Sequence, residues 1–144
     1  ERIVLIEEGS AEVGEISRTL MKQAGWYILE VAPIKYPRSD EEWKQSATRD
    51  FSNSYLILRA FELTQYDRLI YLDADGMALR PLDHFWEDRF FRGNITSRME
   101  HNTLQNTMSC ALMIFRPNPD AISWLLQPEL YNHEGWAIQG LINT

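Results

Sequence analysis

Short apolar runs alternate along the chain with stretches in which apolar residues recur at helical spacing. Residues 2–6 and 26–31 are apolar runs rich in β-forming residues, and they predict two strands. Between them, apolar residues recur every three or four positions, which predicts a helix that ends at Gly25. The recurring residues are Val13, Ile16, Leu20 and Ala24. The order strand, helix, strand is typical of a parallel βαβ unit.

The alternation of helical and strand patterns continues to the end of the chain. Residues 51–63 predict a helix with one apolar side, and the run at 69–72 predicts a strand buried on both faces of a parallel sheet. The later predicted elements are a short helix at 81–86, a buried strand at 110–115, a helix at 120–126 and a helical segment at 134–144. Interleaved strands and helices predict an α/β domain of three layers around a mostly parallel central sheet.

Two carboxylates follow the strand at 69–72 directly, in the order Asp73-Ala74-Asp75-Gly76. Ligands of open α/β sheets collect at the carboxyl ends of the strands, and Gly76 allows the backbone to turn sharply there. Carboxylate oxygens suit hard cations such as Mg²⁺ or Mn²⁺, whose shell a substrate phosphate can complete. The residues therefore predict a divalent-metal site for an anionic ligand. The alternative is an ordinary acidic turn, in which Asp and Gly are common.

Composition narrows the classes of partner. The chain has 144 residues, of which 44% are hydrophobic, so it can form the core of one domain. A net charge of −7 argues against a nucleic-acid partner or an anionic membrane surface, and no apolar run approaches the length of a bilayer span. We expect Cys110 to be a buried structural thiol. The sequon Asn94-Ile95-Thr96 suits a secretory lumen such as the Golgi, while a cytoplasmic location stays open.

The segment LTQYDRLIYLDADGMALRPLDHFW, at 63–86, resembles the core of the glycogenin-like glycosyltransferases, glycosyltransferase family 8. The later segments ALMIFRPNPDA and QGLINT are similar to further segments of that family, and RIVLIEEG and GWYILEVAPIKYP match its early strands in order. The resemblance implies a GT-A-type, Rossmann-like fold. It also implies transfer of a hexosyl or N-acetylhexosaminyl group from a UDP-sugar donor to a glycan or protein acceptor, with retention of configuration.

The resemblance assigns roles to particular residues. Asp73 and Asp75 match the family's metal motif, which together with Ala74 would hold the UDP part of the donor through Mn²⁺ or Mg²⁺. Ser109 stands among the small residues that line the sugar site, and Gln139 matches a family glutamine in a later segment. We expect Ser109 and Gln139 to be the catalytic residues of this chain.

Several positions depart from the family pattern. Ile57 stands where the family has a lysine that holds the donor, so we expect Arg59 to take over that contact. Ile138 replaces an aspartate next to Gln139. The family's first uridine-binding strand and its His-Gly motif, which supplies a third metal ligand, have no counterpart in the chain. We therefore expect residues 1–144 to form a single, truncated GT-A domain.

Two other functions fit parts of the same pattern. The departures at Ile57 and Ile138 are compatible with a catalytically degenerate glycosyltransferase fold that serves as a binding module. An apolar strand that ends in Asp-x-Asp-Gly also resembles the first motif of haloacid-dehalogenase-like phosphatases. In that case Asp73 would be the nucleophile and Asp75 a general acid and base.

Overall fold

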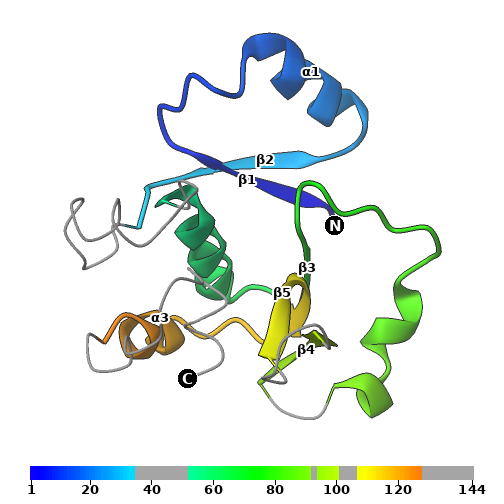
Figure 1. The fold of residues 1–144 in the computed structure, drawn as a ribbon. Helices are drawn as coiled ribbons and strands as arrows, with labels where there is room; N and C mark the ends of the chain where they lie inside the picture. The colour runs from blue at the N-terminus through cyan, green and yellow to red at the C-terminus, as the bar shows by residue number, and fades with distance from the viewer. Residues whose placement is uncertain (35–51, 92–93, 101–106, 128–144) are drawn as a thin grey trace. The chain divides into compact units, whose positions relative to one another are not determined.

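The structure is a computed structural model that describes residues 1–34, 52–91, 94–100 and 107–127. Its contacts divide the chain into two compact units, Glu1–Ala60 and Phe61–Thr144, and each unit is described by itself (Figure 1). The helical segment predicted at 134–144, including Ile138 and Gln139, lies outside the described residues. The single domain predicted for the chain stays a prediction.

The first unit contains the βαβ arrangement that the apolar pattern predicts. Strand β1 (Ile3–Glu7) pairs in parallel with β2 (Tyr27–Val31), with Ile3 opposite Tyr27, and α1 (Glu15–Gln23) connects them (Figure 1). The helix ends at a left-handed glycine, Gly25, whose φ is 81°. Its N–H donates to Lys22 O, and Trp26 N–H donates to Met21 O, which is the Schellman pattern. The predicted helix stop is confirmed.

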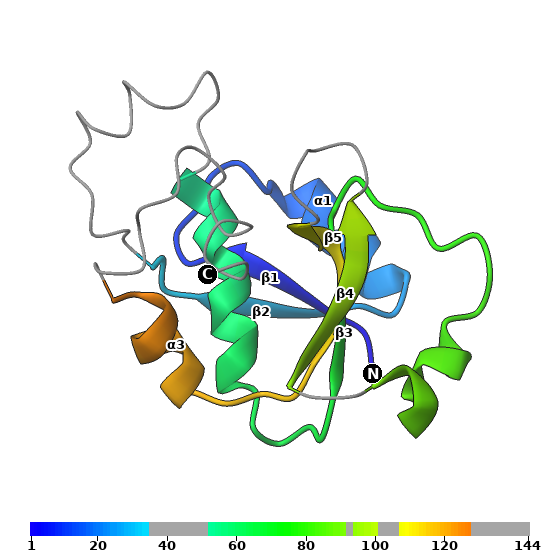
Figure 2. The same ribbon diagram turned by 60° about the horizontal axis from the view of Figure 1, so that its bottom comes forward.

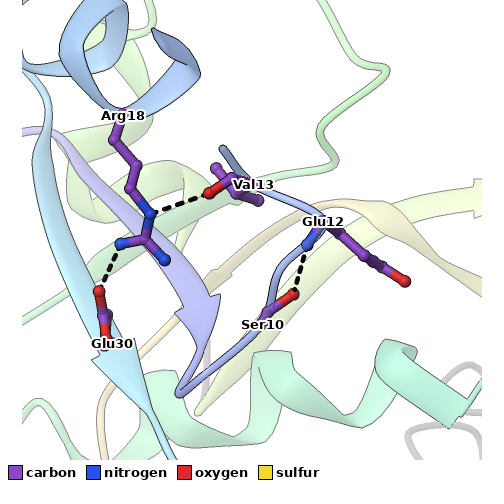
Figure 3. Close-up of polar contacts among 5 residues, drawn as sticks. All are labelled: Ser10, Glu12, Val13, Arg18 and Glu30. Carbon is purple, nitrogen blue, oxygen red and sulfur yellow. Dashed lines mark hydrogen bonds and ion pairs between the residues drawn. The ribbon is translucent and has the colours of Figure 1, made fainter. Parts of the chain in front are cut away.

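Arg18 of α1 connects the helix to the loop before it and to β2. Its Nε donates to the carbonyl oxygen of Val13 at 2.9 Å, and its guanidinium forms an ion pair with Glu30 of β2 (Figure 3). In the same loop, Glu12 N–H donates to the hydroxyl of Ser10 at 3.3 Å. Only 17% of the Arg18 side chain is exposed, so these contacts hold the loop before α1 against the strand that follows the helix.

The apolar spacing located α1 correctly, but its apolar side chains are not in a core. Ile16 is 79% exposed and Leu20 is 59% exposed, and none of the residues of α1 is buried. A sheet of two strands offers little surface for covering a helix, because one strand pair is only about 5 Å wide between neighbouring backbones. The helical spacing of apolar residues therefore predicted α1 correctly, but the burial that this spacing suggests for its side chains is absent.

The helix predicted at 51–63 is present as η1 (Ser52–Glu62), which is a 3₁₀ helix. Tyr55, Leu58 and Phe61 are each at most 2% exposed, which matches the predicted apolar side. Because a 3₁₀ helix has three residues per turn, positions 55, 58 and 61 line up along one side. The boundary between the two units falls within η1, after Ala60.

The second unit contains a three-stranded sheet in the order β3 (Leu69–Leu72), β5 (Thr107–Phe115), β4 (Ile95–Glu100) (Figure 2). Both outer strands are antiparallel to β5, with Leu69 and Ile95 opposite Phe115. The strands predicted at 69–72 and 110–115 are therefore confirmed. The parallel setting predicted for 69–72 is wrong, because an apolar run carries no information about strand direction. The predicted burial on both faces is also wrong, since none of the four residues of β3 is buried and Leu72 is 37% exposed. In the described part of the chain β3 lies at the edge of its sheet.

Strand β4 was not predicted from the sequence. Its pairing with β5 shifts register between Ser97 and Met99, and such an irregularity interrupts the alternation of inward and outward side chains. In the sequence, β4 also carries only two apolar residues, Ile95 and Met99, with the polar Ser97 midway between them. The pattern by which a half-buried strand is recognised is thus absent from this segment.

Short helices complete the second unit. The segment between Asp73 and Phe91, called the excursion below, leads from β3 toward β4 and contains η2 (Asp83–Trp86) and η3 (Asp88–Phe90) (Figure 1). Helix α3 (Asp120–Leu125) follows β5. The buried side chains of the unit come mainly from β5, joined by the aromatic residues before and after the excursion. They are Phe61, Phe91, Cys110, Met113, Ile114, Phe115 and Leu125. None of the helices in the described part of the chain is long and apolar enough to cross a membrane.

Candidate metal and diphosphate site

The candidate site begins with a tight turn at the end of β3. Asp73 N–H donates to Ala111 O of β5 at 3.0 Å, and Gly76 N–H donates back to Asp73 O at 2.8 Å. A Cβ on Gly76 would lie 2.8 Å from Leu72 Cδ1 and 3.0 Å from Asp73 O, both closer than ordinary contacts. Only glycine fits this turn without a shift, so the sequence of the motif determines its backbone shape.

The side chain of Asp73 is held by Tyr71, which stands two positions earlier on β3. The phenol of Tyr71 donates to Asp73 Oδ1 at 2.5 Å. Burial raises the pKa of Tyr71 far above its usual range, and the hydrogen bond to Asp73 and the charges of Asp73, Cys110 and Asp75 raise this pKa further. Tyr71 is therefore a neutral hydrogen-bond donor to Asp73.

The donor set of the turn suits a hard divalent cation. Asp73 is partly buried, whereas Ala74 and Asp75 are exposed, so the carboxylates of Asp73 and Asp75 can be approached from solvent. Among the described residues, no group of three or more His, Cys, Asp or Glu side chains could together hold a metal ion. Two carboxylates match the way Mg²⁺ commonly binds, with substrate phosphates and water in the other positions.

Ser109 of β5 is linked to Asp73 indirectly, through Ala111. Ala111 accepts the Asp73 N–H with its carbonyl, and Ala111 N–H donates to Ser109 Oγ at 3.3 Å. Ser109 is only 6% exposed, and its carbonyl accepts a hydrogen bond from the hydroxyl of Ser97 on β4. Ser109 thus connects to the turn through hydrogen bonds within the sheet, and its predicted catalytic role stays a prediction.

The other predicted site residues are in the first unit or outside the described chain. Arg59 of η1 donates from Nε to the carbonyl oxygen of Ala32 at 2.8 Å, which fixes its side chain near the end of β2. Ile57, at the position of the family's lysine in the resemblance, is 4% exposed and lies on a second buried side of η1, together with Ala60. Gln139 lies outside the described residues. The predicted donor contact of Arg59 is not tested by these interactions.

Arg68, at the other end of β3, anchors the excursion that follows the carboxylates. It donates to Trp86 O at 2.9 Å, forms an ion pair with Asp88, and stacks on the ring of Phe91 with 5.0 Å between Cζ and the ring centroid. Arg116 lies 5.3 Å from the same centroid. Both ends of the segment between Asp73 and Phe91 are therefore fixed to the sheet.

Comparison with known proteins places these features in context. No protein-family model matches the chain. The chain is 25% identical to UDP-glucuronate:xylan alpha-glucuronosyltransferase 1 of Arabidopsis thaliana over 80% of its own length and 15% of that protein. It is 24% identical to inositol phosphorylceramide glucuronosyltransferase 1 of the same plant over 82% of its length and 19% of that protein. With galactinol synthase 1 of Ajuga reptans the identity is 26%, over 86% of the chain and 38% of that protein.

These distant relatives are glycosyltransferases of family 8, which confirms the resemblance found in the sequence. The chain spans only 15% to 38% of the length of the three relatives. The mixed helices and strands and the small parallel sheet agree with the predicted α/β class. Whether the complete arrangement is of the GT-A type stays a proposal.

Two residues of this region were missed in the sequence. Tyr71 could have been found from strand periodicity, because positions 71 and 73 point to the same side of β3. Arg68 gave no comparable signal, since its partners Trp86 and Asp88 are separated from it by a long excursion.

Proposed function

We propose that the chain is the part of a family 8-type glycosyltransferase that holds the metal and the diphosphate of a UDP-sugar, within a GT-A-type fold. The turn formed by Asp73, Ala74, Asp75 and Gly76 carries the proposal, because its backbone is fixed and it presents two carboxylates. The similarity to glycosyltransferases supports a UDP-sugar as the ligand and a glycan or protein as the acceptor.

The residues of the chain would act by binding and orienting. Asp73 and Asp75 would hold Mn²⁺ or Mg²⁺, and Tyr71 fixes the direction of the Asp73 carboxylate. When bound, the cation would neutralise the charge that develops on the departing UDP. Ala74 has a small, exposed side chain between the two carboxylates, which leaves room for the ribose end of the donor. The predicted roles of Ser109, Gln139 and Arg59 belong to this proposal.

A binding module without turnover is the second candidate. Ile57 favours it, because a buried isoleucine replaces the lysine that the family uses toward the donor. Ile138 adds a second apolar replacement at a family carboxylate. In this case UDP and Mn²⁺ would bind at the same turn, and the sugar would remain attached to the diphosphate.

The phosphatase alternative has less support. It needs Asp73 as an attacking nucleophile and Asp75 as a general acid and base, and the sequence has no later apolar strand that ends in paired acidic residues. The similarity to glycosyltransferases also offers no support for a phosphatase.

Since we expect no turnover from the truncated domain alone, the deciding experiment uses the full-length protein that carries this chain. It measures UDP release from a panel of UDP-sugars that includes UDP-glucuronate, with and without Mn²⁺. We expect release that requires Mn²⁺ and is lost in Asp75→Asn. Asp67→Asn is the matched control, because Asp67 is an exposed aspartate in the turn before β3. Binding of UDP without release identifies the binding module, and the absence of both overturns the proposed function. A phosphorylated Asp73 would establish the phosphatase.

A further inference from the structure

The contact between Tyr71 and Asp73 distinguishes the two carboxylates of the motif. Asp73 takes part in three hydrogen bonds, through its N–H to Ala111, its carbonyl from Gly76 and its Oδ1 from Tyr71. Asp75 is exposed and no described hydrogen bond of the turn holds its side chain. One carboxylate is thus fixed in direction before any cation arrives, and the other can adapt.

The hydrogen bond leaves the two oxygens of Asp73 in different situations. Oδ1 accepts the phenolic hydrogen at 2.5 Å, within the range of strong O–H···O⁻ hydrogen bonds. In the described part of the chain, Oδ2 has no hydrogen-bond partner. A cation that approaches Asp73 therefore meets one unshared oxygen and one whose electron density is already drawn toward Tyr71. This arrangement favours coordination through a single oxygen.

Single-oxygen coordination discriminates between cations by size. Mg²⁺ binds at about 2.0–2.1 Å with near-ideal octahedral geometry, which a carboxylate bound through both oxygens would distort. Ca²⁺ binds at about 2.3–2.6 Å with six to eight ligands and readily uses both oxygens of a carboxylate. A carboxylate that is held to one oxygen therefore suits the smaller ion.

We propose that Tyr71 is a positioning residue that holds Asp73 in a one-oxygen geometry, so that the site selects Mg²⁺ and Mn²⁺ over Ca²⁺. The inference rests on the proposed function, because it requires a cation at Asp73 and Asp75. It adds a residue outside the Asp-x-Asp motif and a selectivity that the motif alone does not determine. Tyr71 acts through Asp73 and does not contact the cation.

The test measures Mn²⁺ binding by electron paramagnetic resonance in the presence of UDP, with competition by Mg²⁺ and by Ca²⁺. For Tyr71→Phe we expect Mn²⁺ affinity to fall about 10- to 100-fold, as is typical when a hydrogen bond to a metal ligand is removed. We also expect the ratio of Mg²⁺ affinity to Ca²⁺ affinity to fall, because the Asp73 carboxylate can then bind through both oxygens. Tyr27→Phe is the matched control, because it removes an exposed tyrosine hydroxyl from β2.

The outcomes separate the inference from the proposed function. Failure of the wild type to bind Mn²⁺ with UDP overturns the proposed function, and the inference with it. Binding by the wild type that is lost in Asp75→Asn but unchanged in Tyr71→Phe overturns the inference alone. A purely structural role of Tyr71 would lower the melting temperature and leave the ratio of Mg²⁺ to Ca²⁺ affinity unchanged, which also overturns it. For a variant of low stability, the rise in melting temperature on adding Mn²⁺ and UDP gives the same comparison.

Discussion

The ring of Phe61, at the end of η1, stacks on the ring of Phe115, at the end of β5, with centroids 4.4 Å apart and planes inclined by 25°. Phe61 is 2% exposed and Phe115 is fully buried. Phe115 also stands opposite Leu69 of β3 and Ile95 of β4. A single side chain thus packs at the point where the helix and all three strands of the second unit meet.

The first prediction concerns this packing. Phe115→Ala should lower the free energy of unfolding by about 3–5 kcal/mol, because it removes a buried ring and leaves a cavity. Trp124→Ala is the control, since Trp124 of α3 is 52% exposed, and its effect should stay below about 1 kcal/mol. Urea denaturation followed by circular dichroism measures both. Equal losses in the two variants would show that Phe115 does not hold the unit together.

The second prediction concerns the turn that presents the carboxylates. Gly76→Ala should lower the free energy of unfolding by about 1–3 kcal/mol, because the new methyl group would overlap with Leu72 and the carbonyl of Asp73. Mn²⁺ affinity should fall as well, since the turn must shift to make room. Calorimetric titration with Mn²⁺ and UDP, together with urea denaturation, measures both effects.

Gly14→Ala provides the control for the glycine substitution. A Cβ at Gly14 would have nothing within 4 Å, and the φ of this residue is −68°, which alanine adopts readily. The free energy of unfolding should therefore change by less than about 1 kcal/mol, and Mn²⁺ affinity should not change. If both variants behave alike, the steric account of Gly76 is wrong.

The third prediction is a pH dependence at the anchor of the excursion. The hydrogen bond from Arg68, followed by the positive charge of Arg68, lowers the pKa of Asp88. The folded state therefore favours the ionised carboxylate. Its contribution to stability is present above the unfolded pKa of about 3.9 and is lost as the pH falls through the lower folded pKa.

Asp88→Asn tests this linkage. The variant should be less stable than the wild type at pH 7, and the difference should shrink as the pH falls below about 4. Urea denaturation at a series of pH values measures it, with Asp67→Asn as the control, because no described contact holds Asp67. A difference that stays constant with pH would exclude the ionised pair as its source.

Apolar patterns predicted most of the helices and strands, but they did not predict how the strands of the second unit pair. The strand, helix, strand order of the first unit and the strands predicted at 69–72 and 110–115 followed from local patterns, because each needs only the residues of its own segment. The antiparallel sheet depends on pairing between segments far apart in the chain, and local patterns in a single sequence do not show which segments pair. The segment of β4 also has only two apolar residues, Ile95 and Met99, so the alternation that marks a half-buried strand is incomplete.

Some residues of the candidate site could be recognised from the sequence motif, and others could not. The carboxylates Asp73 and Asp75 and the need for Gly76 were visible as a motif, since they are consecutive. The contribution of Ala111 to the turn was not visible, because it comes from a strand almost forty positions later. Tyr71 lies within the motif's own strand, but its role depends on a side-chain direction that the motif alone does not specify.

The last prediction uses Cys110, the single cysteine of the chain, to follow the site from within. Cys110 is 8% exposed, as expected for a structural thiol, and it lies close enough to Tyr71 to contribute to the raised pKa of that residue. A buried thiol reacts with a thiol reagent only when the surrounding structure opens. The labelling rate of the folded protein should therefore be far below that of the unfolded chain.

The labelling rate should also report on the turn. Gly76→Ala, which disturbs the turn beside β5, should label faster than Gly14→Ala, and Mn²⁺ with UDP should slow labelling of the wild type. Rapid labelling of the folded wild type would contradict the burial of Cys110. Equal labelling rates in the two glycine variants would show that disturbing the turn does not change access to the thiol.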